Sequence, residues 1–562
     1  MGIPSYFSYI TRKYPKIITE LRAASTPVDR LYLDCNSIVY DTMRMPPAMN
    51  TSDTPAEFEN QLIGRVIDQI RKYIAKIAPL HGVFIAFDGV APLAKMKQQR
   101  TRRYKAAAMT SQGGGGGASA WSTANITPGT NFMNQLSMRV ADAFSTTDER
   151  RRYPDIGVHA HAMNIKVSGS TEAGEGEQKM FAHMRAHAAI SDVIAVYGLD
   201  ADLIMLGLFH TRICKRIIIC REAPSFNQQP VNNRAKKTPD DNELLVLDIN
   251  VLAISIKDHM KCSGASNHVV MDYVFMCFFL GNDFMPHFPA LNIRTHGMDA
   301  ILDVYRKTFA RSQFRSSLLT PELRIHWPSL QLWLQNLAKY EYGWLINEYT
   351  ARERAVARLL HNTPNNTPPT PLTTEEKMLH APLIYRGTEK YICPSEDGWE
   401  IRYYTALFPE YTSNETSEPG PFIIHSFFEG LEWVLSYYTA ECLDWRWLYP
   451  YEYAPLLADL SKHAPRNGTA PPSFGWGPTN PVHPHTQLAY VTPITLHSII
   501  PNIDFQEHLR TTYAELYISP TTPTYEWAFC RYMWEAHAHM PVISTDIITE
   551  WDTYNNFAAL SI

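Results

Sequence analysis

Short apolar runs, most of which end in an aspartate or a glycine, recur through the first half of the chain. Their length suits buried strands, which we predict over residues 31–34, 83–88, 193–198, 217–220 and 244–248. Apolar residues at helical spacing between them predict helices over residues 61–77, 94–108, 131–144 and 175–190. Strands that alternate with helices favour an α/β fold with a mostly parallel sheet. Ligands of such a sheet bind beyond the carboxyl ends of its strands, so we expect the chemistry there.

The composition changes after a segment rich in Thr, Pro and Asn, which covers residues 362–374. We predict that this segment is a linker or long loop and that the five glycines at 113–117 lie in a surface loop. The chain then divides into an N-terminal domain over residues 1–361 and a second domain over residues 375–562. The second domain is rich in aromatic residues and proline, and we expect a helical or mixed α/β structure packed on the first.

Composition excludes several classes of protein. The chain has 562 residues, of which 45% are hydrophobic, and this suits a globular protein of two or three domains. No run of about 18 apolar residues predicts a membrane span, and the first residues lack the features of a secretion signal. Eight scattered cysteines suit reduced thiols. We therefore expect an intracellular protein, in the cytoplasm rather than the nucleus.

The net charge of −5 does not indicate nucleic-acid binding, but the distribution of charge does. No acidic residue occurs between Asp88 and Asp142, whereas cations are frequent there. Within this stretch, residues at i, i+4 and i+8 and one adjacent arginine share nearly one helix face: Lys95, Gln99, Arg103 and Arg102. Three cations and an amide on one face predict a site for a terminal phosphate. The alternative is an exposed basic helix face without a ligand.

Seven carboxylates stand at strand ends, in glycine-rich turns or at helix ends: Asp34, Asp88, Glu175, Glu177, Asp200, Asp202 and Asp283. Any one of them could be a turn former or a helix cap. Together they would repel one another strongly unless cations neutralised them. Carboxylate oxygens are the ligands that Mg²⁺ and Mn²⁺ prefer, and two such ions can activate water and stabilise the leaving oxygen in phosphodiester hydrolysis. We therefore predict a site for two Mg²⁺ or Mn²⁺ ions.

These motifs resemble the XRN family of 5′→3′ exoribonucleases over nearly the whole chain. The matching first-half segments are MGIPSYF, LYLDCNSIVY, FDGVAPLAKMKQQRTRRYKAA, ITPGTNFM, STEAGEGEQKM, YGLDADLIMLGL and FLGNDFMPHFP. In the second half EGLEWVLSYY, DWRWLYPYEYAPLLADL and WEAHAHMPVI match the second conserved region. The resemblance implies a PIN-like core, metal binding by all seven acids, and processive release of nucleoside 5′-monophosphates in RNA decay. It also implies that the four residues of the basic face bind the 5′-monophosphate of single-stranded RNA.

Base stacking is where the sequence departs from the family. Relatives place a stacking histidine where this chain has Tyr40, which can still stack on a base. The resemblance implies a tryptophan partner, either Trp445 or Trp447, and the sequence leaves both open, with core packing as the alternative for each. Two interpretations of Asn36 stay open: it could orient a metal-bound water, or it could hydrogen-bond to polar groups at the end of the strand.

Two other functions fit part of the pattern. A flap-endonuclease-like DNA nuclease would share the metal chemistry but would need an arch for duplex DNA. A catalytically inactive RNA-binding scaffold would be expected to lose metal ligands, and none is lost. The chain stops soon after the second conserved region, so we expect a monomer without a docking extension for protein partners.

Overall fold

The computed structural model describes residues 3, 5–20, 27–45, 54–112, 121–145, 164–222, 244–261, 268–310, 316–361, 380–409, 411, 420–477, 479–517 and 524–560. The glycine run at 113–117 and the predicted linker at 362–374 lie outside these residues, so both loop assignments stay predictions. In the described part of the chain no helix has the length and apolarity that crossing a membrane requires.

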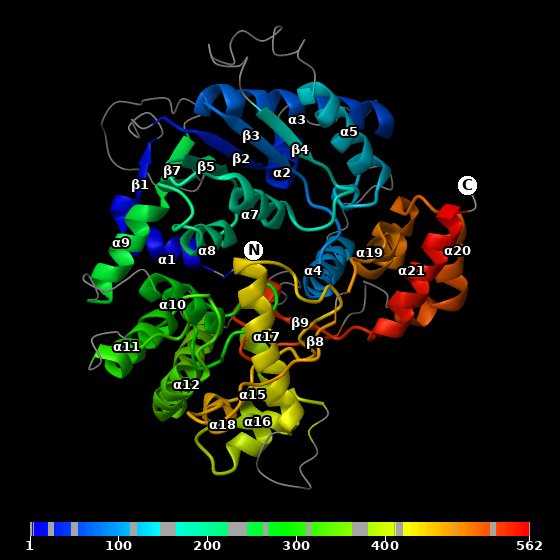
Figure 1. The fold of residues 1–562 in the computed structure, drawn as a ribbon. Coiled ribbons are helices and arrows are strands. Elements are labelled where there is room, and N and C mark those ends of the chain that lie inside the picture. The colour runs from blue at the N-terminus through cyan, green and yellow to red at the C-terminus, as the bar shows by residue number, and fades with distance from the viewer. Residues whose placement is uncertain are drawn as a thin grey trace.

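A seven-stranded sheet forms the centre of the first half (Figure 1). Its strands, in spatial order, are β1 (Ile18–Glu20), β7 (Leu244–Asp248), β6 (Arg216–Glu222), β5 (Val193–Tyr197), β2 (Arg30–Asp34), β3 (Gly82–Ala86) and β4 (Asn164–Ser168). From β6 to β4 all neighbours are parallel, whereas β7 and β1 are antiparallel additions at one edge. The mostly parallel sheet and its five predicted strands are confirmed; β1 and β4 were not predicted.

Helices cover both faces of the sheet. Figure 1 shows α3 and α5 above it and α7 and α8 below. The bounds of the helices around the sheet are α1 (Tyr6–Lys13), α2 (Cys35–Arg44), α3 (Pro55–Ile77), α5 (Asn131–Ser145), α7 (Gly176–His187), α8 (Asp202–Phe209) and α9 (Ile249–His259). Leu31 and Leu33 pack among α2, α3 and α5, whereas Tyr32 packs on the opposite face. Because both faces are buried, the strands read as continuous apolar runs instead of alternating ones.

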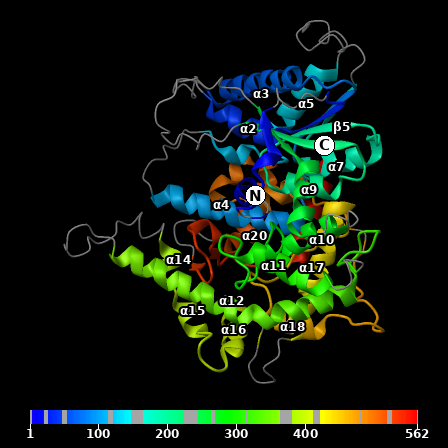
Figure 2. The same ribbon diagram turned by 90° about the vertical axis from the view of Figure 1, so that its left-hand side faces the viewer.

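The rest of the described chain consists of helices, the loops that connect them and a short two-stranded pair. It contains α10 (His268–Cys277), η5 (Phe278–Leu280), α11 (Gly297–Phe309), α12 (Trp327–His361), α14 (Ala381–Ile384), α15 (Gly387–Ile392), α16 (Trp399–Leu407), α17 (Pro421–Thr439), α18 (Leu457–His463), α19 (Pro484–Val491), α20 (Ile503–Thr512), β8 (Tyr525–Glu526), β9 (His537–Ala538) and α21 (Thr545–Leu560). Figure 2 shows the length of α12, which packs against α18. One apolar core cluster joins residues of both predicted domains, such as Tyr273 and Trp433.

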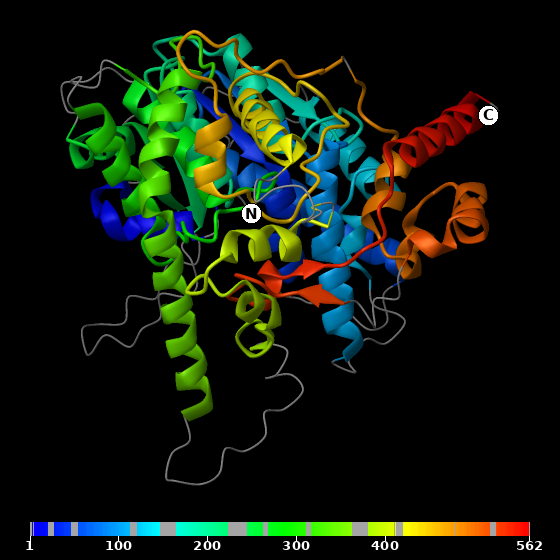
Figure 3. The ribbon, with the colours of Figure 1, turned by 90° about the horizontal axis from the view of Figure 1, so that it is seen from below.

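Helix α4 (Leu93–Gln112) lies between the sheet and the C-terminal elements (Figure 3). It packs against α19 and β9. Arg100 donates to the carbonyl oxygens of Pro541 at 2.9 Å and Leu516 at 3.1 Å. Lys105 donates to the carbonyl oxygen of Trp534 at 2.9 Å. Part of the cation run therefore holds the C-terminal segment in place, because each of these side chains satisfies backbone carbonyls that the fold buries.

A buried carboxylate joins three parts of the second half. Glu389 on α15 is fully buried and forms ion pairs with Arg352 of α12, at 2.6 Å, and with Arg386. It also accepts the N–H of Phe529 at 2.9 Å. Each interaction belongs to a different segment, so Glu389 fixes the positions of α12, α15 and the segment before β9 relative to one another.

We expect Glu389→Ala to lower the free energy of unfolding by about 3–5 kcal/mol, because it leaves two buried arginines without a counter-charge. Urea unfolding followed by circular dichroism measures the change. Glu396→Ala, which removes an exposed carboxylate close in sequence, is the control and should stay within about 0.5 kcal/mol of the parent protein. Equal effects of the two substitutions would contradict the role given to Glu389.

Candidate active site

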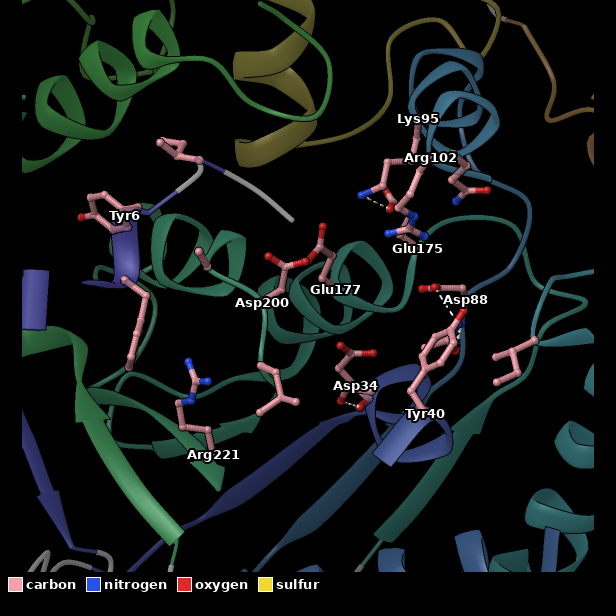
Figure 4. Close-up of a pocket in the computed structure, with 18 of the residues that line it drawn as sticks. Tyr6, Asp34, Tyr40, Asp88, Lys95, Arg102, Glu175, Glu177, Asp200 and Arg221 are labelled. Atoms are coloured by element: carbon pink, nitrogen blue, oxygen red, sulfur yellow. Dashed lines mark hydrogen bonds and ion pairs between the residues drawn. The ribbon is translucent and has the colours of Figure 1, made fainter. Parts of the chain in front are cut away.

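A cavity of about 590 Å³ opens at the carboxyl ends of the central strands. Five of the seven predicted carboxylates line it: Asp34, Asp88, Glu175, Glu177 and Asp200. All four residues of the predicted basic face line it as well: Lys95, Gln99, Arg102 and Arg103. Figure 4 shows the acids in the middle of this cavity with the α4 side chains above them. The structure therefore brings the predicted acids and the predicted phosphate-binding face into one site.

The topology of the sheet explains why acids far apart in sequence meet. Asp34 is the last residue of the central strand β2, and Asp88 follows its neighbour β3 by two residues. Asp200 follows β5, the neighbour on the other side. Glu175 and Glu177 stand at the start of α7, which packs on β2 and β3. Parallel neighbours end at the same edge, so their terminal side chains converge there.

Asp202 and Asp283 lie behind the cavity and are not among the described residues that line it. Asp202 is the first residue of α8 and is 1% exposed. Asp283 follows η5 and accepts a hydrogen bond from Gln98 Nε2 at 3.1 Å. Electrostatic coupling between Asp202, Asp200 and Asp283 shows that these two carboxylates still belong to the acidic cluster.

Gly176 lets the backbone approach two of the carboxylates closely. Its N–H donates to Asp88 Oδ1 at 2.7 Å. A Cβ atom at this position would stand 3.4 Å from both Asp34 Oδ1 and Asp88 Oδ1. A Cβ atom would therefore be in ordinary van der Waals contact with both carboxylates, and a larger side chain would extend into the space that glycine leaves open.

Asn36 holds the carboxylate of Asp88 through a reciprocal pair of hydrogen bonds. Its Nδ2 donates to Asp88 Oδ2 at 2.7 Å, and its Oδ1 accepts the N–H of Asp88 at 3.0 Å. Neither reading of Asn36 from the sequence included this contact. The amide fixes the orientation of Asp88, so its role in this structure is to position a cavity acid.

Burial dominates the electrostatics of the acids. It raises the pKa of Asp34 well above the ordinary value, and the negative charges of Asp88 and Asp200 raise it further. Burial likewise raises the pKa of Glu177, with Asp202 adding to the effect. For Asp202 itself, burial together with Asp200 and Asp283 raises the pKa to about 8. Ionising these groups together is therefore costly without a counter-charge.

The donor set fits a hard divalent cation, although the side chains do not converge on one point as they stand. Every predicted ligand offers carboxylate oxygen, which Mg²⁺ and Mn²⁺ prefer. Asp202 Oδ1 is buried with no hydrogen-bond partner among the described residues. Yet in the described part of the chain no three acidic, histidine or cysteine side chains are grouped as a metal site. Metal binding would therefore require these carboxylates to adopt other rotamers.

Lys95 lies between two of these carboxylates and accounts for part of their separation. Its ammonium lies 2.6 Å from Glu175 Oε1 and 2.7 Å from Asp283 Oδ2. Burial lowers the pKa of Lys95, but the negative charges around it, Asp283 and Glu175 foremost, together hold the pKa well above the ordinary value. Conversely, burial raises the pKa of Asp283, but nearby positive charge, that of Lys95 foremost, brings the pKa below its ordinary value. Lys95 thus supplies one of the counter-charges that the buried acids need, and a phosphate role for it stays a prediction.

Arg103 has a free donor next to the cavity. Its Nη2 donates to Thr127 Oγ1 at 2.5 Å, whereas Nη1 is buried without a partner among the described residues. Burial, assisted by the neighbouring charge of Arg102, lowers the pKa of Arg103 to about 10, which leaves the guanidinium charged at neutral pH. Arg102 is exposed. A half-buried cation with one buried, unsatisfied N–H favours binding of an anion.

The loop before α5 supplies the residue that holds Arg103. Thr127 donates its own hydroxyl to the carbonyl oxygen of Ala124 at 2.6 Å, and Ile126 and Pro128 line the cavity beside it. Thr130 caps α5, because its Oγ1 accepts the N–H of Met133 at 3.3 Å. The loop therefore forms one wall of the cavity and fixes the Arg103 side chain.

The predicted stacking residues are separated. Tyr40 lines the cavity near Arg103 and is half-buried. Trp447 is 7% exposed and stacks on Trp433, with ring centroids 4.8 Å apart, so it packs in the core in this structure. Trp445 is half-buried, and its carbonyl oxygen accepts the N–H of Leu93 at 2.9 Å, at the start of α4. Neither tryptophan lines the described cavity, and the stacking pair stays a prediction.

The sequence did not predict that α17 would reach the acids. The Tyr437 hydroxyl donates to Glu175 Oε2 at 2.7 Å. Burial, assisted by the charge of Asp202, raises the pKa of the adjacent Tyr438 well above its ordinary value. Both tyrosines belong to the segment EGLEWVLSYY, and neither spacing nor charge connects that segment with the acids. The second half of the chain therefore takes part directly in orienting one of the carboxylates, Glu175.

Acids at the carboxyl edge of a parallel sheet, opposite a cationic helix face, define an α/β protein of the nuclease type. Comparisons with known proteins agree with this class. Residues 1–223 match the family described as the XRN 5′-3′ exonuclease N-terminus, and residues 265–394 and 386–553 match the Xrn1 helical domain. The chain therefore belongs to the XRN family.

Curated relatives are similar over most of the chain. A 5′-3′ exoribonuclease 2 of Candida albicans is 24% identical over 90% of this chain and 67% of its own length. The protein of the same name from Gallus gallus is 25% identical over 89% of this chain and 64% of its own length. The Saccharomyces cerevisiae protein is 28% identical over 61% of this chain and 39% of its own length. The chain thus spans about two thirds or less of the length of these relatives.

Proposed function

We propose that this protein is a 5′→3′ exoribonuclease that acts in RNA decay and hydrolyses 5′-monophosphorylated RNA processively to nucleoside 5′-monophosphates. The observation that carries the proposal is the single cavity in which five carboxylates face the cationic side of α4. Acids and cations have distinct tasks in such a site: the acids serve bond cleavage and the cations select the end of the strand. Family membership and the names of the relatives support the same activity.

The residues of the chain would divide the work as follows. Arg103 and Arg102 would bind the terminal phosphate, with Gln99 beside them, through charge-assisted hydrogen bonds. The closed wall of Ile126, Thr127 and Pro128 next to Arg103 limits the room beyond that phosphate. A terminal monophosphate would fit this pocket better than a bulkier triphosphate or cap.

The seven carboxylates would hold divalent ions, which we propose to be two Mg²⁺ or Mn²⁺. Such ions supply an activated water and stabilise the charge that develops on the leaving oxygen. Asn36 and the N–H of Gly176 keep Asp88 oriented, and Tyr437 does the same for Glu175. Single-stranded RNA is the proposed substrate, because a strand threaded past α4 reaches the acids with its end held.

A single assay separates this proposal from its alternatives. Single-stranded RNAs of one sequence, labelled at the 3′ end and carrying a 5′-monophosphate, a 5′-triphosphate or a 5′-hydroxyl, are incubated with the protein with and without Mg²⁺, beside a flapped DNA duplex. We expect rapid mononucleotide release from the monophosphate RNA and only with the metal. Preferred cleavage of the flap would favour a DNA nuclease of the flap-endonuclease type. Tight RNA binding without cleavage under every condition would favour an inactive scaffold.

A further inference from the structure

We propose that Arg221 forms a second phosphate subsite, which holds the RNA backbone one nucleotide downstream of the bond that is cut. This inference rests on the proposed function and deepens it. Arg221 lies on β6 and lines the same cavity as the acids. Among the described residues of that lining, Arg221 is the one cation that does not belong to α4.

The position of Arg221 is opposite that of the phosphate-binding face. Figure 4 shows the carboxylates of Asp34 and Asp200 between Arg221 on one side and Lys95 and Arg102 on the other. A strand whose first phosphate lies at α4 has its scissile phosphate at the acids. The next phosphate along the strand then falls on the far side of the acids, where Arg221 stands.

The environment of Arg221 leaves it ready to bind an anion. Its Nε is buried and has no hydrogen-bond partner among the described residues. Its guanidinium lies 4.2 Å from the ring centre of Phe7, which fixes the plane of the fork. Ser5 and Ser8 of the α1 region line the same cavity and offer further hydroxyl donors. A held arginine fork with an unused N–H matches the geometry of a phosphate.

If Arg221 served only as the counter-charge of a buried acid, that acid would have no other partner. Asp200 and Asp41 both act on its charge, but Asp41 also pairs with Arg44 on α2, at 3.6 Å. Asp200 is itself a predicted metal ligand. The acids near Arg221 therefore leave its guanidinium available to a further anion, for which a backbone phosphate has the matching charge.

Substrate length tests the subsite. The dinucleotide pNpN carries only the terminal phosphate and the scissile one, whereas the trinucleotide pNpNpN adds the phosphate assigned to Arg221. We expect Arg221→Ala to lower kcat/KM on the trinucleotide about tenfold or more, mainly through KM, and to change it less than about threefold on the dinucleotide. Arg221→Lys keeps the charge but loses the forked guanidinium, so its kcat/KM on the trinucleotide should lie between the values for the unmodified protein and Arg221→Ala.

Arg44→Ala is the matched control, because it removes an arginine whose side chain is 71% exposed from neighbouring α2. Its kcat/KM on each of the two substrates should stay within about twofold of the value for the unmodified protein. Equal losses on the two substrates in Arg221→Ala would overturn the subsite and assign Arg221 to the fold or to Asp200, and unchanged trinucleotide kinetics would overturn it too. Failure of the unmodified protein to cleave either substrate would instead overturn the proposed function itself, and the subsite with it.

Discussion

Asp202→Asn is expected to reduce RNA cleavage by at least about 10³-fold while making the metal-free protein more stable. Loss of cleavage follows because the substitution removes one of the carboxylates proposed to hold the metal ions. The gain in stability follows because Asp202 is 1% exposed and its Oδ1 has no hydrogen-bond partner among the described residues. An ionised group in that position destabilises the fold, and asparagine removes the charge at nearly constant volume.

The effect of Asp202→Asn on stability should depend on pH. Burial and the charges of Asp200 and Asp283 raise the folded-state pKa of Asp202 to about 8, above an unfolded value near 4. A raised pKa gives a stabilising contribution that is complete below about pH 4 and is lost as the pH rises towards 8. The melting temperature of the variant should therefore match that of the parent protein near pH 4 and exceed it increasingly up to pH 8. At pH 8 the free energy of unfolding of the variant should exceed that of the parent protein by a few kcal/mol, which corresponds to a melting temperature about 5–10 °C higher.

Differential scanning fluorimetry in EDTA between pH 4 and 8 measures this gain. Asp192→Asn is the matched control, because Asp192 is also buried but accepts hydrogen bonds from Arg30, at 2.8 Å, and from the N–H of Ala189, at 2.9 Å. That substitution should lower the melting temperature. A lower melting temperature for Asp202→Asn at pH 8 would show that Asp202 contributes structurally, and retained cleavage would remove it from the metal site.

Arg103→Ala is expected to remove the preference for a 5′-monophosphate. Arg103 is half-buried, and its Nη1 is buried without a partner among the described residues, so this donor is available to a terminal phosphate. We expect kcat/KM on 5′-monophosphate RNA to fall about 30- to 100-fold, as for the loss of a charge-assisted pair in a buried site. On 5′-hydroxyl RNA, which has no such phosphate, the change should stay below about threefold.

Competition between the two RNAs in one reaction measures this preference directly. Lys105→Ala provides the control on the same helix: Lys105 faces away from the cavity and donates to the carbonyl oxygen of Trp534. It should lower the melting temperature and leave the preference for the monophosphate end unchanged. If Arg103→Ala slows the cleavage of both RNAs equally, the α4 face supports the fold or the arrangement of the acids and does not select the 5′ end of the RNA.

Much of the fold could be predicted from the sequence because its strands are buried on both faces. Complete apolar runs such as residues 193–197 are recognisable without knowledge of their neighbours. The strands that were missed, β1 and β4, lie at the edges of the sheet, where the described residues supply a partner on one side only and the apolar signal is weak. Local patterns also placed Asp34 and Asp200 at strand ends and gave Lys95, Gln99 and Arg103 one helix face.

The sequence by itself determined which residues could share a face or an edge, since the periods of helix and strand depend only on local geometry. Only the tertiary structure decided which neighbours those faces meet. It divided the cations of α4 between the cavity and the C-terminal carbonyls, and it placed Asp202 behind the cavity wall. It also brought Tyr437 to Glu175 and Arg221 to the far side of the acids. These contacts join residues far apart in the chain, and their partners are set by packing of the whole core, which no local pattern encodes.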